Sequence, residues 1–329
     1  MLEADIAMKG KFDLNIVSRK AVYHLEIERK ITVIKGNSGT GKSSLLRLIA
    51  DYLELGKDSG IKLSQDKPVR MLVLRNSSDW VEILNDIHDA IVFIDEDVRC
   101  LYDDAFQRAI WKADCYAVIV SRSGMFQALP YAIASIYELR TTRQGKTTIT
   151  SMYELYQAGR AEKHADYVLT EDSHSGWEMA QLAFPCPVEP TNGNSNVLKE
   201  LKHAASEHQD ICLIVDGAAF GGFIEPVLQL AEMTGRAKIL APESFEYILL
   251  QSDSLSKYLT NELVATYDYC DCQEYISWEK YYEALLVRLA AEHLRISYQK
   301  SKLPELFKNP QYVAAYLDVI WNHLVKRTS

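Results

Sequence analysis

The stretch GNSGTGKS, residues 36–43, decides the fold of the first half of the chain. It fits the P-loop pattern GxxxxGKS, whose glycines let the backbone curl so that successive N–H groups face phosphate oxygens. A β-branched run from Lys30 to Lys35 precedes it, and Ser43 to Leu53 carries leucine and isoleucine at helical spacing. Strand, glycine loop and helix therefore follow in the order that a phosphate site requires. The residues expected to bind nucleotide are Gly36, Asn37, Ser38, Gly39, Thr40, Gly41, Lys42, Ser43 and Ser44.

A pair of carboxylates downstream supplies the remaining chemistry. The apolar run Ile91 to Ile94 predicts a buried strand that ends in Asp95 and Glu96. We expect Ser43 and Asp95 to hold Mg²⁺ beside the phosphates of ATP. Lys42 and Glu96 are the expected catalytic residues, with Glu96 orienting or deprotonating the attacking water. An acid directly after the magnesium aspartate favours hydrolysis over phosphoryl transfer to another molecule.

Arginines further along the chain bear on the kind of phosphate chemistry. Arg122, at the end of the next predicted strand, is a candidate sensor of the γ-phosphate, with a plain surface arginine as the alternative. A small-molecule kinase remains a minor alternative to hydrolysis, because Arg140 and Arg143 could contribute to a basic lid.

Apolar strand-like segments alternate with helix-like segments, which predicts an α/β fold class with largely parallel sheets. Two hairpins are expected in the first half, one over Phe12 to Ile27 and one whose strands, Ser135 to Arg140 and Thr147 to Tyr153, flank a glycine turn. Between the hairpins, the expected strands are Val69 to Leu74, Ala90 to Ile94 and Tyr116 to Val120, and the expected helices are Asp79 to His88 and Tyr102 to Trp111.

A second alternating series begins at Asp166, and the chain becomes mostly helical by periodicity after about Glu243. Its longest expected helices are Trp278 to Tyr298 and Tyr312 to Val325. We therefore expect a P-loop NTPase parallel sheet, a second α/β sheet and a helical C-terminal tail packed on the second domain. The expected boundaries are 1–160, 161–242 and 243–329.

The glycine loop through Leu46, with the hairpin before it, resembles the ABC-type ATPase family over residues 1–155. The resemblance implies binding and hydrolysis of ATP. The chain departs from the family because no LSGGQ-like signature precedes Asp95 and because Arg122 stands where a switch histidine is expected. The stretch from Lys42 to Asp95 is also too short for the usual helical subdomain. Slow hydrolysis or a nucleotide-dependent switch therefore fits as well as rapid turnover.

Two strands of the second series end in acids. Tyr167 to Thr170 runs into Glu171, and Ile211 to Val215 runs into Asp216. Because the carboxyl ends of parallel strands share one edge, Glu171 and Asp216 are expected to converge on one divalent cation. Carboxylate oxygens suit Mg²⁺ or Mn²⁺. The alternative is that both acids are solvated strand ends or helix caps.

The order strand-acid, helix, strand, helix, strand-acid resembles a Toprim domain over residues 164–242, and its pairing with an ATPase resembles a compact OLD-family protein. The resemblance implies action on DNA or RNA, as a nuclease, and a role in phage defence. The two acids match the family's motif, but Ala218 replaces the second acid of DxD, and Asp172 or Glu243 is a candidate substitute. The alternative is an ATP-dependent switch or scaffold whose Toprim-like half is catalytically inactive.

Composition limits the partners. The 329 residues carry a formal charge of −9, so a nucleic-acid partner needs a specific site rather than overall attraction. Apolar runs fall far short of the roughly 20 residues that span a bilayer, so we expect no membrane partner and a cytoplasmic location. Six cysteines predict neither a disulfide framework nor a paired zinc motif, although Cys270 and Cys272 could touch a metal. A second copy of the chain or another protein remains an open partner.

Overall fold

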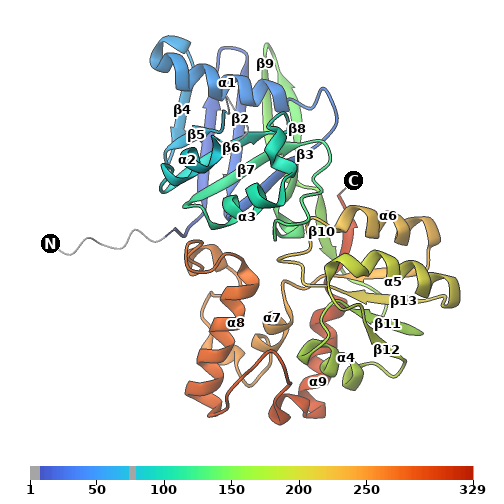
Figure 1. Cartoon of the computed structure of the whole chain (residues 1–329). Helices are drawn as coiled ribbons and strands as arrows, with labels where there is room; N and C mark the ends of the chain where they lie inside the picture. The colour runs from blue at the N-terminus through green and yellow to red at the C-terminus, as the bar shows by residue number, and fades with distance from the viewer. Residues whose placement is uncertain (1–7, 74–78, 329) are drawn as a thin grey trace. The chain divides into compact units, whose positions relative to one another are not determined.

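The computed structural model describes residues 8–73 and 79–328, and its helices and strands are drawn in Figure 1. The chain divides into two compact units. The first covers the chain as far as Leu155 together with Ala265–Ser277, and the second covers Tyr156–Val264 together with Trp278–Ser329. Each unit combines a β-sheet with helices, so the chain is an α/β protein. Within the described ranges, no helix is both long and apolar enough to cross a membrane.

The sheet of the first unit contains nine strands among the described residues, in the order β4-β1-β2-β9-β8-β3-β7-β6-β5. Neighbouring strands β8, β3, β7, β6 and β5 run parallel, whereas β8 and β9 form an antiparallel hairpin that joins this group to β2 and β1. Both predicted hairpins are confirmed, but they make the sheet mixed rather than largely parallel. The bounds are β1 Phe12–Val17, β2 Ala21–Ile27, β3 Ile31–Lys35, β4 Lys62–Gln65, β5 Val69–Met71, β6 Ala90–Asp95, β7 Cys115–Ser121, β8 Ile136–Gln144 and β9 Thr147–Glu154.

Helix α1, Lys42–Leu55, connects the glycine loop to the core of the first unit. Its leucine and isoleucine positions form one apolar face, and Leu45, Leu46 and Ile49 on that face are buried in the sheet's core cluster. Helices α2, Trp80–Asn85, and α3, Asp104–Lys112, fall inside or close to the predicted ranges. The expected strand at residues 69–74 ends earlier, at Met71, and Leu74 lies outside the described residues.

Segment Ala265–Ser277 belongs to the first unit, whereas the sequence predicted that everything after residue 242 packs with the second domain. Its backbone is tied to the start of the chain, because the N–H of Cys272 donates to the carbonyl of Met8 at 2.7 Å. The ammonium of the buried Lys30 also donates to the Cys272 carbonyl, at 3.3 Å. The residues that make these polar contacts lie far apart in the sequence, so local hydrophobic periodicity could not predict the contacts.

The second unit's described residues form a six-stranded sheet in the order β10-β15-β14-β13-β11-β12. The core strands β12, β11, β13 and β14 run parallel, as the second alternating series predicted, and β15 and β10 add to one side antiparallel. The bounds are β10 Tyr156–Gly159, β11 Tyr167–Thr170, β12 Val188–Pro190, β13 Ile211–Ile214, β14 Ala237–Leu240 and β15 Leu324–Arg327. The helices of this unit are α4 Ser175–Ala183, α5 Asn194–Glu207, α6 Ile224–Thr234, α7 Phe245–Leu250, α8 Trp278–Leu289 and α9 Pro310–Trp321.

Both long C-terminal helices end before the predicted residues. The helix expected to reach Tyr298 continues from α8 as a π-helical turn, Ala290–Leu294, and stops at Arg295, whose φ of 56° is incompatible with a right-handed helix. The helix expected to reach Val325 stops at Trp321, and the chain continues as strand β15. Strand pairing on both sides, with β14 and β10, satisfies the backbone groups of β15 and overrides the helical pattern.

Candidate functional site

Adjacent parallel strands of the first unit end level with one another at one edge of the sheet. Lys35, which ends β3, pairs with Ser121 of β7, and Val120 of β7 pairs with Asp95 of β6. This is the edge at which open α/β sheets bind ligands. The residues that follow these strand ends are Gly36, Glu96 and Arg122.

A pocket of about 220 Å³ lies at this edge. Residues 37–44 of the glycine loop and of the start of α1 line it, together with Glu96 and Arg122. A single water molecule needs only about 10–15 Å³, so the pocket has room for a group of many atoms. The structure therefore brings eight of the nine predicted nucleotide-binding residues, all but Gly36, and the predicted base Glu96 to one cavity.

Hydrogen bonds to the glycine loop hold the side chain of Lys42, the residue that follows the loop. Its side chain is buried, with the residue 8% exposed, and its ammonium donates to the carbonyls of Gly36 and, at 2.9 Å, Asn37. Burial lowers the pKa of Lys42, and the nearby carboxylate of Glu96 opposes that shift while the guanidinium of Arg122 adds to it. These carbonyl contacts hold the ammonium of Lys42, which is one of the residues that line the pocket.

Tyr23, which the sequence analysis missed, fixes the end of the glycine loop from β2. Its hydroxyl donates to the carbonyl of Gly41 at 3.0 Å, and the N–H of Leu45 donates to the same carbonyl at 2.9 Å. Gly41 has a φ of 97°, which favours glycine, and an added Cβ would lie 3.2 Å from the Tyr23 hydroxyl. Both observations explain why a glycine stands directly before the lysine.

The two expected magnesium ligands of the first unit occupy different places. Ser43 is exposed and lines the pocket. Asp95 ends β6 and is half-buried, and it is not among the described residues that line the cavity. Burial raises the pKa of Asp95, because the charged form is disfavoured where water is excluded. The side chains present suit a hard cation, because both offer oxygen.

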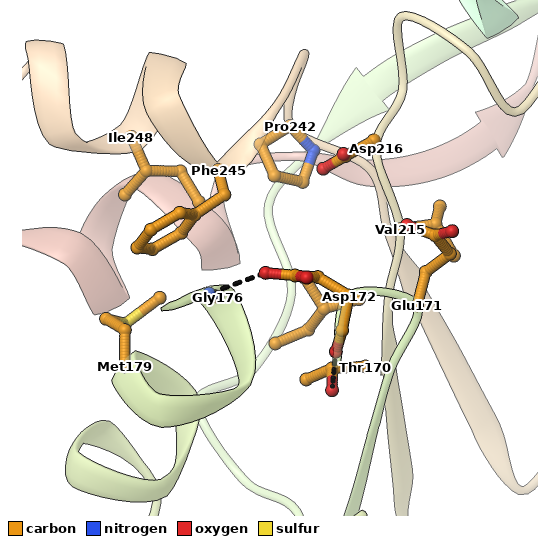
Figure 2. A pocket seen from close by; sticks show the side chains of 11 residues that line it. Thr170, Glu171, Asp172, Gly176, Met179, Val215, Asp216, Pro242, Phe245 and Ile248 are labelled. Atoms are coloured by element: carbon orange, nitrogen blue, oxygen red, sulfur yellow. Dashed lines mark hydrogen bonds between the residues drawn. The ribbon is translucent and has the colours of Figure 1, made fainter. Parts of the chain in front are cut away.

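In the second unit, the structure brings Glu171 and Asp216 to one cavity. The last residues of β11 and β13, Thr170 and Ile214, pair in parallel register, and the acids follow these strand ends. Both acids line a pocket of about 20 Å³, which has apolar side chains from α4 and α7 on its other side (Figure 2). Burial, followed by the carboxylate of Glu279, raises the pKa of Glu171 to about 7, and the same causes raise the pKa of Asp216.

A lysine and further acids lie beside these two carboxylates, and no motif in the sequence indicated any of them. Lys300 places its ammonium 2.8 Å from Oε1 of Glu279 and 3.9 Å from Oδ2 of Asp216. Glu246, from α7, is fully buried and accepts a hydrogen bond from the Tyr298 hydroxyl at 3.0 Å. Burial by itself lowers the pKa of Lys300, but the carboxylates of Asp216, Glu279 and Glu246 outweigh burial and raise it.

Of the candidate substitutes for the missing DxD acid, Asp172 lines the same pocket as Glu171 and Asp216, whereas Glu243 is not among the described residues that line it. Ala218 is itself buried, and its N–H donates to the carbonyl of Glu243 at 2.9 Å, so Glu243 meets this loop through its backbone. Asp172 accepts from the N–H of His174 at 3.0 Å. It also accepts from the N–H of Gly176, in the first turn of α4, at 2.6 Å (Figure 2). Each oxygen of Asp172 thus accepts one backbone hydrogen bond.

Across residues 8–73 and 79–328, no group of three or more histidine, cysteine, aspartate or glutamate side chains is arranged to hold a metal ion. This includes Cys270 and Cys272, which are buried in the first unit. Comparison of the sequence with known protein-family models gave no match, and comparison with curated proteins gave none. What can be inferred about function therefore rests on the chemistry of these two sites.

Proposed function

We propose that the first unit is a P-loop ATPase, in the manner of the ABC-type enzymes whose motif it resembles. The observation that carries the proposal is the shared pocket of residues 37–44, Glu96 and Arg122. A phosphate chain in this pocket would meet the loop's N–H groups, the positive end of α1 and the Lys42 ammonium. These are the groups needed to neutralise the charge of a nucleoside triphosphate.

Hydrolysis requires a cation beside the phosphates and a base for the attacking water. Mg²⁺, when bound, would neutralise the phosphate oxygens, with Ser43 and Asp95 as the protein's oxygen donors. When a nucleotide binds, the buried Lys42 ammonium would exchange its hydrogen bonds to neutral loop carbonyls for hydrogen bonds to phosphate oxygens. Glu96, which lines the pocket, would accept the proton of a water molecule that attacks the γ-phosphate.

Nucleotide binding and hydrolysis are tested separately with two variants. Lys42→Ala is expected to weaken ATP binding by about 10–100-fold, since it removes charged hydrogen bonds, and the exposed Lys57→Ala serves as the matched control. Glu96→Gln is expected to bind ATP normally and to lose about 10²–10⁴-fold in turnover. Calorimetric binding and phosphate release measure the two effects. Undiminished affinity in Lys42→Ala would overturn the proposal.

We propose further that the second unit is a switch or scaffold controlled by the nucleotide, rather than a nuclease. The supporting observations are the buried Ala218, at the position of the second DxD acid, and the Lys300 ammonium within the acid cluster. Two-metal cleavage needs enough free carboxylates to hold both ions. Covalent connections at 155–156, 264–265 and 277–278 join the units and offer routes for coupling.

Nuclease activity is the competing function, and it has a direct test. The protein is incubated with ATP, Mg²⁺ or Mn²⁺ and plasmid DNA or RNA, beside Glu171→Ala and Asp216→Ala variants. We expect intact nucleic acid together with ATP hydrolysis. Cleavage by the wild type that both variants abolish would establish the nuclease and reject the switch.

A further inference from the structure

The acid cluster of the second unit contains its own cation. Lys300 makes an ion pair of 2.8 Å with Glu279 and lies 3.9 Å from Asp216. Two α-helices and two strand ends contribute the surrounding carboxylates, so the positive charge sits where elements distant in sequence meet. The acids of this cluster are Glu171, Asp216, Glu246 and Glu279.

The position of Lys300 is set by its backbone as well as by its charge. Its carbonyl accepts from the N–H of Ser175, the first residue of α4, at 3.3 Å. The flanking residues Gln299 and Lys302 form an antiparallel bridge, so Lys300 lies within a tight turn. Tyr298, two residues earlier, hydrogen-bonds both Ser175 and Glu246. The ammonium is therefore presented to the cluster by an ordered turn.

A divalent cation does not fit beside this ammonium. Mg²⁺ binds carboxylate oxygens at about 2.0–2.1 Å and usually keeps several of its waters. An ion on Asp216 would therefore lie within a few ångströms of the Lys300 nitrogen, where like charges repel strongly. The pocket beside Glu171 and Asp216, about 20 Å³, has room for about one water molecule rather than a hydrated ion.

Glu246 gives a second, independent indication that the protein itself supplies the positive charge at this acid cluster. Its side chain is fully buried, and its Oε2 has no hydrogen-bond partner among the described atoms. A buried carboxylate of this kind needs either a proton or a nearby positive charge. Burial raises its pKa, and Lys300 is the cation that acts on it most strongly in the opposite direction.

We infer that Lys300 is the resident cation of the second unit's acid cluster and that this unit binds no divalent cation while the ammonium is in place. The ammonium offsets part of the negative charge that a metal would otherwise offset. The expected Mg²⁺ site on Glu171 and Asp216 is thereby replaced by an ion-pair network. This inference goes beyond the proposed ATPase, and its test uses the full chain without nucleotide, so the two can fail separately.

The test is a titration with Mn²⁺ alone, followed by electron paramagnetic resonance of the free ion. Any Mn²⁺ binding by the wild-type protein is expected to remain unchanged in Asp216→Asn. Lys300→Met is expected to gain one Mn²⁺ with affinity raised at least about tenfold, because a like charge has been removed. The double variant Lys300→Met, Asp216→Asn should lose that site again. Thermal unfolding should rise with Mn²⁺ in Lys300→Met and stay unchanged in the wild type.

Lys238→Met is the matched control. Lys238, in β14 of the same unit, pairs with Asp210 at 2.6 Å, and its side chain is 26% exposed, against 28% for Lys300. Its removal should create no Mn²⁺ site. Lys300→Arg, which keeps the charge, should also gain none. Mn²⁺ binding by the wild type that depends on Asp216 overturns the inference, and so does a folded Lys300→Met protein without a new site. If Lys300→Met fails to fold, the wild-type and Asp216→Asn titrations decide.

Discussion

Arg122 holds Glu96 by two separate contacts. Its backbone N–H donates to Oε2 of Glu96 at 2.7 Å, and its side-chain Nε lies 2.9 Å from Oε1. The backbone contact does not depend on the side chain, so the glutamate keeps one fixed partner whatever the guanidinium does. The Arg122 side chain is 68% exposed, which leaves it free to turn toward an anion in the pocket.

Arg122→Ala therefore tests the guanidinium without removing the anchor of Glu96. Because an exposed ion pair contributes about 0–1 kcal/mol, the free energy of unfolding should change by less than about 1 kcal/mol. If the guanidinium stabilises charge on the γ-phosphate, ATP turnover should fall on the order of 10²-fold. The control is Arg108→Ala, another exposed and ion-paired arginine of this unit. Equal turnover in the two variants would make Arg122 a surface arginine.

Tyr23→Phe tests whether the tyrosine hydroxyl braces the glycine loop. The variant loses the hydrogen bond to the Gly41 carbonyl, so unfolding should become easier by about 0.5–1.5 kcal/mol. ATP affinity should fall as well, because the loop before Lys42 is less well ordered. Denaturant unfolding and calorimetry measure the two effects. Tyr153→Phe, at an exposed tyrosine, is the control, and a loss of affinity of the same size there would refute the brace.

The raised pKa of Glu171 predicts a pH dependence of stability. Burial moves the pKa from an ordinary 4.5 to about 7 in the folded chain, so between these values the folded state binds the extra proton. Stability therefore falls as the pH rises through that window. Glu171→Gln, which stays neutral, should show a smaller loss between pH 4.5 and 7 in denaturant titrations. A slope identical to the wild type would mean that other groups cause it.

Gly217, next to Asp216, is tightly enclosed by backbone. An added Cβ would lie 2.7 Å from the carbonyl oxygen of Ala241 and 2.9 Å from that of Pro242. Because backbone cannot move as a flexible side chain can, Gly217→Ala should cost about 1–3 kcal/mol of stability. Chemical denaturation measures the loss. Stability equal to the wild type would show that the loop after β13 relaxes without cost.

Local patterns in the sequence were sufficient to locate the strands and turns around the first site. The glycine loop and the apolar run before Asp95 each carry their signal within a few residues, because the backbone conformations that they need are set by neighbours. The parallel order of strands then brings their ends together. For the same reason, the sequence predicted that Glu171 and Asp216 share an edge, and both do line one pocket.

Only the tertiary structure decided which side chains surround the acids of the second unit and to which unit each segment of the chain belongs. Lys300 and Glu279 sit in segments whose sequence resembles any charged surface, and only the folding of distant segments brings them to the strand-end acids. Strand β15 formed in place of a helix because β14 and β10 offered partners on both sides. Local sequence determines which conformations a segment prefers, whereas long-range pairing and charge neutralisation determine which one it adopts and what surrounds it.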